Sequence, residues 1–170
     1  MQRIRQQLWQ RRERFYIMRI NFYDTRIEDY KTVLIKERAV NYKTVDIREA
    51  NIVTELLNTI VSLNTMGEEH CYMLALNNKK KLIGVFLISK GTVNMTSMNP
   101  REVFIRALLI GASSIILCHN HPSGDTEPSR QDIEVTKAFN ELGRLLGIAL
   151  LDHIIIGGSE YYSFMENGIL

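Results

Sequence analysis

The sequence has little cysteine, proline or glycine: two, three and ten residues out of 170. So few prolines and glycines leave no room for a long disordered linker or a low-complexity tract. Two cysteines do not make a disulfide framework, and both lie in apolar, strand-like runs where a free thiol packs as a small hydrophobic group. With 45% hydrophobic and 24% charged residues, the composition predicts one globular domain with a sizeable core in a reducing, cytoplasmic compartment.

Long apolar runs are also absent from the sequence. No window reaches the roughly 18 uncharged apolar residues that a membrane-spanning helix needs, so we do not expect a membrane partner. Arginines interrupt the N-terminal segment throughout, which excludes a secretory signal with a continuous apolar centre. The formal net charge of +2 is too small to indicate nucleic-acid binding by itself.

Charge is nevertheless unevenly distributed along the chain. The first nineteen residues contain six arginines and a single acid, Glu13. This segment has three interpretations: a solvated helical arm, an arm that contacts nucleic acid or an acidic partner, or a stretch preceding a functional start at Met18. We interpret residues 1–45 as this basic arm plus a lead-in strand centred on Val33–Ile35, and residues 46–170 as the main domain.

The main domain alternates between helical and strand-like patterns. Apolar residues at helical spacing indicate a helix over 46–64 capped by Asp46, and two apolar runs, 71–76 and 82–88, around a polar turn indicate a β-hairpin. The further expected elements are a helix over 101–112, a central strand over 113–121, a helix over 130–147, a strand over 148–158, and a final edge strand or short helix. This order predicts an α/β fold with a mixed central sheet flanked by helices.

Two histidines stand one residue apart in "CHNHPSGD", where the central strand ends. Alternation along a strand places His119 and His121 on the same side. The carboxyl edge of a sheet is where α/β proteins keep their sites, and Asp132 follows at the start of the next helix. Two imidazoles and one carboxylate make a catalytic zinc site with an open fourth position. Asp125 competes with Asp132 as the third ligand by spacing alone.

Ser129 and Asp132 can also be interpreted without a metal ion. Ser129 at a helix start is an N-cap, and Asp132 three residues later favours the positive end of the helix. That reading leaves the histidine pair unexplained. The letters "HNH" do not indicate a nuclease, because in HNH nucleases those residues are spread over tens of positions.

Longer segments of the sequence resemble the RadC-like branch of the JAB/MPN (JAMM) metallopeptidase superfamily. The resembling segments are "ISKGTVN", "NPREVFIRALL", "IILCHNHPSGDTEPSRQDIEVTK", "LGIALLDHIIIG" and "YYSFMENG", which lie within residues 46–170. The resemblance implies a cytidine-deaminase-like sheet architecture and Zn²⁺ held by His119, His121 and Asp132. Members usually carry a helix-hairpin-helix-like domain before the catalytic one, so the resemblance indicates a short, stand-alone version.

The resemblance also implies a function, a zinc-dependent hydrolase that cleaves a peptide or isopeptide bond of a protein substrate through a zinc-activated water. The family glutamate precedes the first strand of the hairpin, and we assign it to Glu69 in preference to Glu68, as general base. Ser129 is the expected hydrogen-bond donor to the oxyanion. The alternatives are a DNA-associated protein, related to DNA repair or mobile elements, that binds nucleic acid through the domain or the arm, and a non-catalytic MPN interaction module.

Three further expectations concern residues around the site. Asp152 and His153, a charged pair within an apolar strand, are expected to support the ligands or the structure. His70 is expected at the surface. The oligomeric state stays open, a dimer included.

Overall fold

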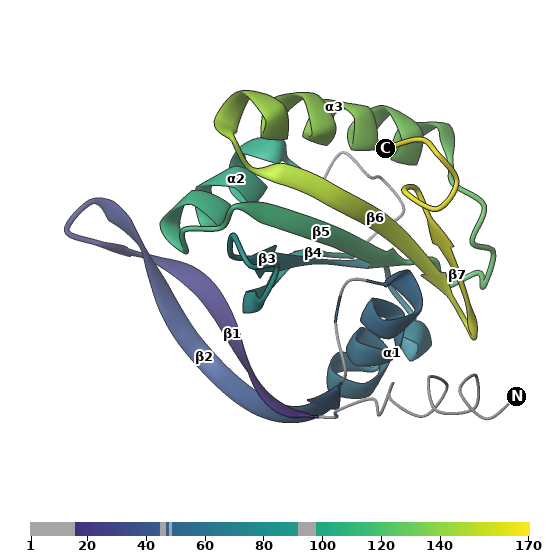
Figure 1. Cartoon of the computed structure of the whole chain (residues 1–170), viewed down its shortest axis with the longest axis horizontal. Coiled ribbons are helices and arrows are strands. Elements are labelled where there is room, and N and C mark those ends of the chain that lie inside the picture. Colours follow the sequence, from purple (N-terminus) through teal and green to yellow (C-terminus); the bar gives the residue numbers. More distant parts are fainter. Residues whose placement is uncertain (1–15, 45–46, 48, 92–97) are drawn as a thin grey trace, which may run out of the picture.

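The computed structural model describes residues 16–44, 47, 49–91 and 98–170. Within these residues the strands form one seven-stranded mixed sheet in the order β2-β1-β4-β3-β5-β6-β7, with helices on both faces (Figure 1). The predicted α/β fold with a mixed central sheet flanked by helices is therefore confirmed.

The elements have the following bounds. They are β1 Tyr16–Glu28, β2 Lys31–Thr44, α1 Ala50–Val61, a short 3₁₀ helix Leu63–Thr65, β3 His70–Leu76, β4 Leu82–Lys90, α2 Pro100–Leu109, β5 Ser114–Asn120, α3 Arg130–Leu146, β6 Ala149–Gly157 and β7 Glu160–Ser163. Figure 1 shows α1 on one side of the sheet and α2 with α3 on the other.

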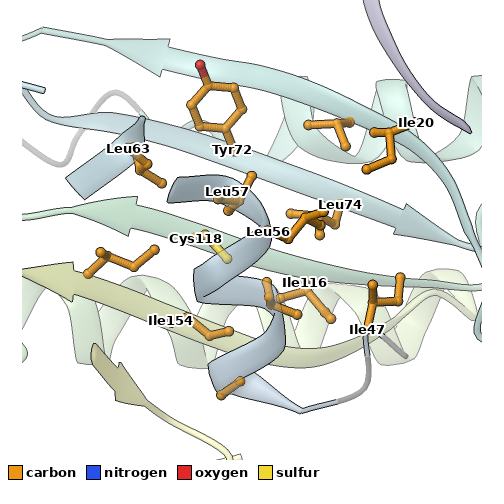
Figure 2. Close-up of a cluster of buried hydrophobic side chains, with 14 of the residues drawn as sticks. Ile20, Ile47, Leu56, Leu57, Leu63, Tyr72, Leu74, Ile116, Cys118 and Ile154 are labelled. Carbon is orange, nitrogen blue, oxygen red and sulfur yellow. The ribbon is translucent and has the colours of Figure 1, made fainter. Parts of the chain in front are cut away.

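The sheet separates two hydrophobic cores, and β5 contributes to both. Ile116 and Cys118 face α1, as Figure 2 shows, whereas Ile115 and Leu117 belong to the core beneath α2 and α3. This is the alternation expected of a strand buried on both faces. It places His119, the next residue on the Leu117 side, on the face covered by α3.

The directions of the strands bring three segments of the chain together at one end of the central strands. β5 pairs antiparallel with β3, so Cys71 near the start of β3 lies opposite His119 near the end of β5. β5 pairs parallel with β6, and α3 forms the crossover between them. The carboxyl end of β5, the first turn of α3 and the beginning of β3 therefore meet, which is where α/β sheets place their sites.

The N-terminal part differs from the expectation. Residues 16–19, which one of the three interpretations placed in a helical arm, belong to strand β1, which forms a long antiparallel hairpin with β2. Ile20 and Phe22 are buried in the core beneath α1, and this burial stabilises the strand over the helix that the basic composition favours. Residues 1–15, with the proposed nucleic-acid contact, lie outside the described residues.

Two further predictions are corrected or completed here. Helix α1 begins at Ala50 with Glu49 at its N-cap, rather than at Asp46, which lies outside the described residues. Of the two possibilities for the C-terminal tail, an edge strand or a short helix, the edge strand is present as β7. Among the described residues, no helix is both long and apolar enough to span a membrane.

The two cysteines are buried free thiols, as predicted. Burial raises the pKa of both Cys71 and Cys118, so both remain protonated thiols near neutral pH. The Sγ of Cys71 lies 3.0 Å from the Sδ of Met98, in the core beneath α2 and α3. These thiols pack as apolar groups rather than acting as nucleophiles.

Candidate metal centre

His119, His121 and Asp132 converge where β5 ends and α3 begins. The Nε2 atoms of the two histidines are 3.1 Å apart, and those of His119 and His121 lie 3.1 and 3.7 Å from the Asp132 carboxylate oxygens Oδ1 and Oδ2. A tetrahedral zinc ion with bonds of 2.0–2.2 Å places its ligand atoms about 3.3 Å apart. One nitrogen of each histidine and one carboxylate oxygen of Asp132 lie within 4.8 Å of one another, so among the described residues the three side chains form a candidate metal-binding group.

The protonation of His121 follows from its hydrogen bond. Its Nδ1 lies 2.7 Å from the backbone carbonyl oxygen of Asp125, which can only accept, so Nδ1 carries the proton. In the neutral ring, Nε2 then has the free lone pair that a metal needs. The carboxylate of Asp125 is exposed and accepts from the Glu127 N–H, outside the metal-binding group. Asp125 therefore contributes through its backbone, as a support for His121.

Two glycines allow the loop carrying this carbonyl to lie against the sheet. Gly124 adopts φ 82°, which favours glycine, and its N–H donates to the His121 carbonyl. A Cβ atom on Gly157, at the end of β6, would clash with the Gly124 carbonyl oxygen. The His121 N–H also donates to the carbonyl of Ile156, at 2.9 Å. The loop is thus fixed to β6 on both sides of its turn.

Asp132 is held in the first turn of α3 by Ser129. The Ser129 N–H and hydroxyl both donate to Oδ2, at 2.7 and 2.5 Å, and the Ser129 Oγ accepts from the Asp132 N–H. The predicted N-cap at Ser129 is confirmed, and the reciprocal bond from its N–H to Asp132 makes it a capping box. Burial acts to raise the pKa of Asp132, but the neighbouring His119 in its protonated form and the hydrogen bonds from Ser129 outweigh it and hold the pKa well below its usual range. The carboxylate is therefore ionised.

The other oxygen of the Asp132 carboxylate, Oδ1, has different surroundings from Oδ2. Oδ1 is fully buried and, among the described residues, accepts no hydrogen bond, although it lies 3.1 Å from the Nε2 of His119. A buried anionic oxygen without a donor is costly unless a cation compensates it. Two imidazole nitrogens and one such oxygen make a donor set that suits zinc.

The adjacent residues Asp152 and His153 have separate roles because they face opposite sides of β6. His153 is fully buried behind His119, with its Nε2 2.9 Å from the His119 Nδ1. Burial, with a smaller effect from His119, lowers the pKa of His153 well below its usual range. Asp152 instead accepts from the Ser163 hydroxyl and the Met165 N–H, and so fastens the C-terminal segment.

The two candidate glutamates also differ in their surroundings. Glu69 is half-buried and lines a small cavity together with Cys71, Met98 and His119. Glu68 is exposed and lies 3.8 Å from the ammonium group of Lys90. These positions favour Glu69 as the residue that faces the metal ligands.

His70, expected at the surface, is buried. Its Nδ1 lies 2.9 Å from the carbonyl oxygen of Glu68, and its N–H donates to the side chain of Asn120. Two residues that the sequence reasoning missed, Asn120 and Thr136, support the site from behind. The signals available were the place of Asn120 between the ligands and that of Thr136 one turn after Asp132.

The fold and site together define an α/β domain with a candidate His-His-Asp metal centre at the carboxyl end of a central strand. The sequence profile of the RadC-like JAB domain matches residues 47–169, and the chain belongs to this family.

Relatives of known sequence support this membership. The chain is 45% identical over 121 residues to a UPF0758 protein of Clostridium acetobutylicum, covering 71% of this chain and 50% of that protein. It is 40% identical over 144 residues to a UPF0758 protein of Alkaliphilus metalliredigens, covering 85% and 60%. The chain spans about half the length of the curated relatives it matches.

Proposed function

We propose that this protein is a zinc-dependent hydrolase that cleaves a peptide or isopeptide bond in a protein substrate. The observation that carries the proposal is the buried Asp132 Oδ1, which has no hydrogen-bond donor among the described residues and lies beside the Nε2 atom of His119. Three protein ligands of this kind are typical of catalytic rather than structural zinc, because they leave a coordination position open. Membership of the RadC-like JAB family supports the same assignment.

The residues around the centre have distinct roles in this proposal. A zinc ion held by His119, His121 and Asp132 would lower the pKa of a bound water to about 7 and so supply the nucleophile for hydrolysis. Glu69 accepts the proton of the attacking water and returns it to the leaving amine. Ser129 donates a hydrogen bond to the oxyanion. In the observed conformation its hydroxyl donates to Asp132, so this role requires the hydroxyl to turn when substrate binds.

The decisive experiment combines a zinc assay with a cleavage screen on a broad peptide library that includes isopeptide-linked substrates. Wild type is expected to contain about one zinc per chain and to cleave, whereas Glu69→Gln is expected to keep zinc and fold but lose cleavage. Glu68→Gln is the matched control, because Glu68 pairs with Lys90 at the surface, and it is expected to retain cleavage. A folded wild type that binds no zinc would overturn the proposal, and loss of cleavage only in Glu68→Gln would reassign the base.

A further inference from the structure

We propose that Thr136 and His153 are positioning residues that fix the tautomer of His119 and so direct the lone pair of its Nε2 toward the metal. The inference rests on the metal-binding part of the proposed function. It follows from a chain of three hydrogen bonds behind the ligand, each with a direction set by the one before it.

The chain begins at the backbone carbonyl of Asp132. The Thr136 Oγ1 lies 2.5 Å from this oxygen, one helical turn away in α3. A carbonyl oxygen can only accept, so the threonine hydroxyl must donate its single hydrogen there. On its other side, Thr136 Oγ1 lies 2.6 Å from the Nδ1 of His153. The hydroxyl has no hydrogen left for this contact, so His153 must donate from Nδ1.

The proton on Nδ1 of His153 in turn determines which nitrogen of His119 is protonated. A neutral imidazole with its proton on Nδ1 has a lone pair on Nε2. The His153 Nε2 lies 2.9 Å from the Nδ1 of His119, so His119 must donate from Nδ1. The remaining nitrogen of His119, Nε2, then has its lone pair free, 3.1 Å from the Asp132 Oδ1 that lacks a donor.

Burial keeps this arrangement in place. Thr136 and His153 are fully buried and His119 is 2% exposed, so exchange with bulk water is restricted. A reversed chain would leave two acceptors, the Thr136 Oγ1 and the Asp132 carbonyl oxygen, facing each other. In the proposed chain the facing acceptors are instead His119 Nε2 and Asp132 Oδ1, the two atoms that a metal ion would join. The ring of His153 is stacked on Phe164, with centroids 5.0 Å apart and an interplanar angle of 11°. His153 therefore has little freedom to rotate away from His119.

Both candidate histidine ligands have the proton on Nδ1 and a lone pair on Nε2, but different neighbours orient them. His121 is oriented directly by the backbone carbonyl of Asp125, on an exposed loop. His119 faces the interior, and its orientation depends on a side chain of α3 and a side chain of β6. One consequence is that α3 contributes twice to the centre, through the Asp132 carboxylate and, by way of Thr136, through the carbonyl of the same residue.

The test begins with the metal-free protein and compares Thr136→Val, which keeps the shape but removes the acceptor, with Thr136→Ser, which keeps the hydroxyl. Long-range ¹H–¹⁵N NMR of the imidazoles reports the tautomers. Wild type and Thr136→Ser are expected to show His119 protonated on Nδ1, and Thr136→Val is expected to lose this preference. Zinc titration should show a 10- to 100-fold weaker affinity for Thr136→Val and rescue by Thr136→Ser.

A second variant keeps the proposal testable if Thr136→Val does not fold. His153→Phe retains an aromatic ring against Phe164 but removes both nitrogens, and it is expected to weaken zinc binding 10- to 100-fold. A wild-type His119 protonated on Nε2, or folded Thr136→Val and His153→Phe proteins that bind zinc as tightly as wild type, would overturn the inference. Absence of peptide cleavage by wild type bears only on the proposed function, because neither readout involves a substrate.

Discussion

Asn120 accepts a hydrogen bond at its side-chain Oδ1 from the backbone N–H of His70, at 2.8 Å. Its Nδ2 donates to the carbonyl oxygens of Met66 and Glu68, at 3.2 and 3.1 Å. A residue placed between two metal ligands thus fixes the backbone segment that carries both candidate glutamates. Its side chain points away from the candidate metal ligands, yet it holds the segment that carries Glu69, the proposed general base.

Asn120→Asp should separate this segment from the metal. The substitution replaces two donated hydrogens with a carboxylate oxygen facing two carbonyls, in a side chain that is 1% exposed. We expect the free energy of unfolding, measured with denaturant, to fall by at least about 2 kcal/mol, and cleavage to be lost while zinc stays bound. Asn78→Asp, at an exposed turn, is the control and should change stability by less than about 0.5 kcal/mol. An Asn120→Asp protein with unchanged turnover would contradict this role.

Asp132→Asn and Asp125→Asn distinguish the two acids that the spacing left open. Asp132→Asn removes the anionic oxygen that faces His119, and zinc affinity should fall by more than about 100-fold. Asp125→Asn should leave zinc bound, because the backbone carbonyl of residue 125 orients His121. Zinc content after dialysis measures both, and the reverse pattern would show that the loop acid is the ligand.

Gly157→Ala should weaken the metal centre from outside it. The added Cβ clashes with the Gly124 carbonyl, so the loop that holds the His121 acceptor must move. We expect zinc affinity to fall about 10-fold and stability to fall by about 1–3 kcal/mol. Gly67→Ala, where a Cβ meets no atom within 4 Å, is the matched control. Equal zinc affinities in isothermal titration would show that the loop does not depend on this close approach.

Asp152 should make stability depend on pH in the metal-free protein. Burial raises its pKa above the ordinary value of 3.8, against the opposing effect of the Ser163 hydroxyl. The folded state therefore binds more protons than the unfolded state, and the contribution of Asp152 to stability is fully present below pH 3.8 and falls as pH rises through the folded pKa. The difference in unfolding free energy between wild type and Asp152→Asn should decrease over this window. A difference that grows with pH would contradict the direction of the shift.

Much of the site could be predicted from local sequence patterns. Alternation along β5 correctly placed His119 beside Leu117 and opposite Cys118, and the residue types at the helix start correctly predicted Ser129 as the N-cap with Asp132 in the first turn. Both are short-range rules that depend only on strand or helix geometry. The same alternation places Asp152 and His153 on opposite faces of β6.

The parts that escaped prediction depend on contacts between distant residues. The Asn120 to His70 bond joins residues 50 apart, and the Thr136 to His153 bond joins residues 17 apart. Such bonds require the register of neighbouring strands, which one sequence does not reveal. Strand β1 was missed for a related reason, because its two fully buried residues, Ile20 and Phe22, are explained only by the core that they complete.

The position of the ligands along the chain has a consequence for related proteins. His119, His121 and Asp132 belong to one continuous stretch, whereas Glu69 arrives from the beginning of β3 on a segment tied down by Asn120. The candidate metal ligands and the proposed general base therefore lie on separate segments of the polypeptide. Under the proposed function, a homologue altered only at the beginning of β3 would keep its metal and its fold but lose cleavage, so zinc content alone would not measure catalytic competence.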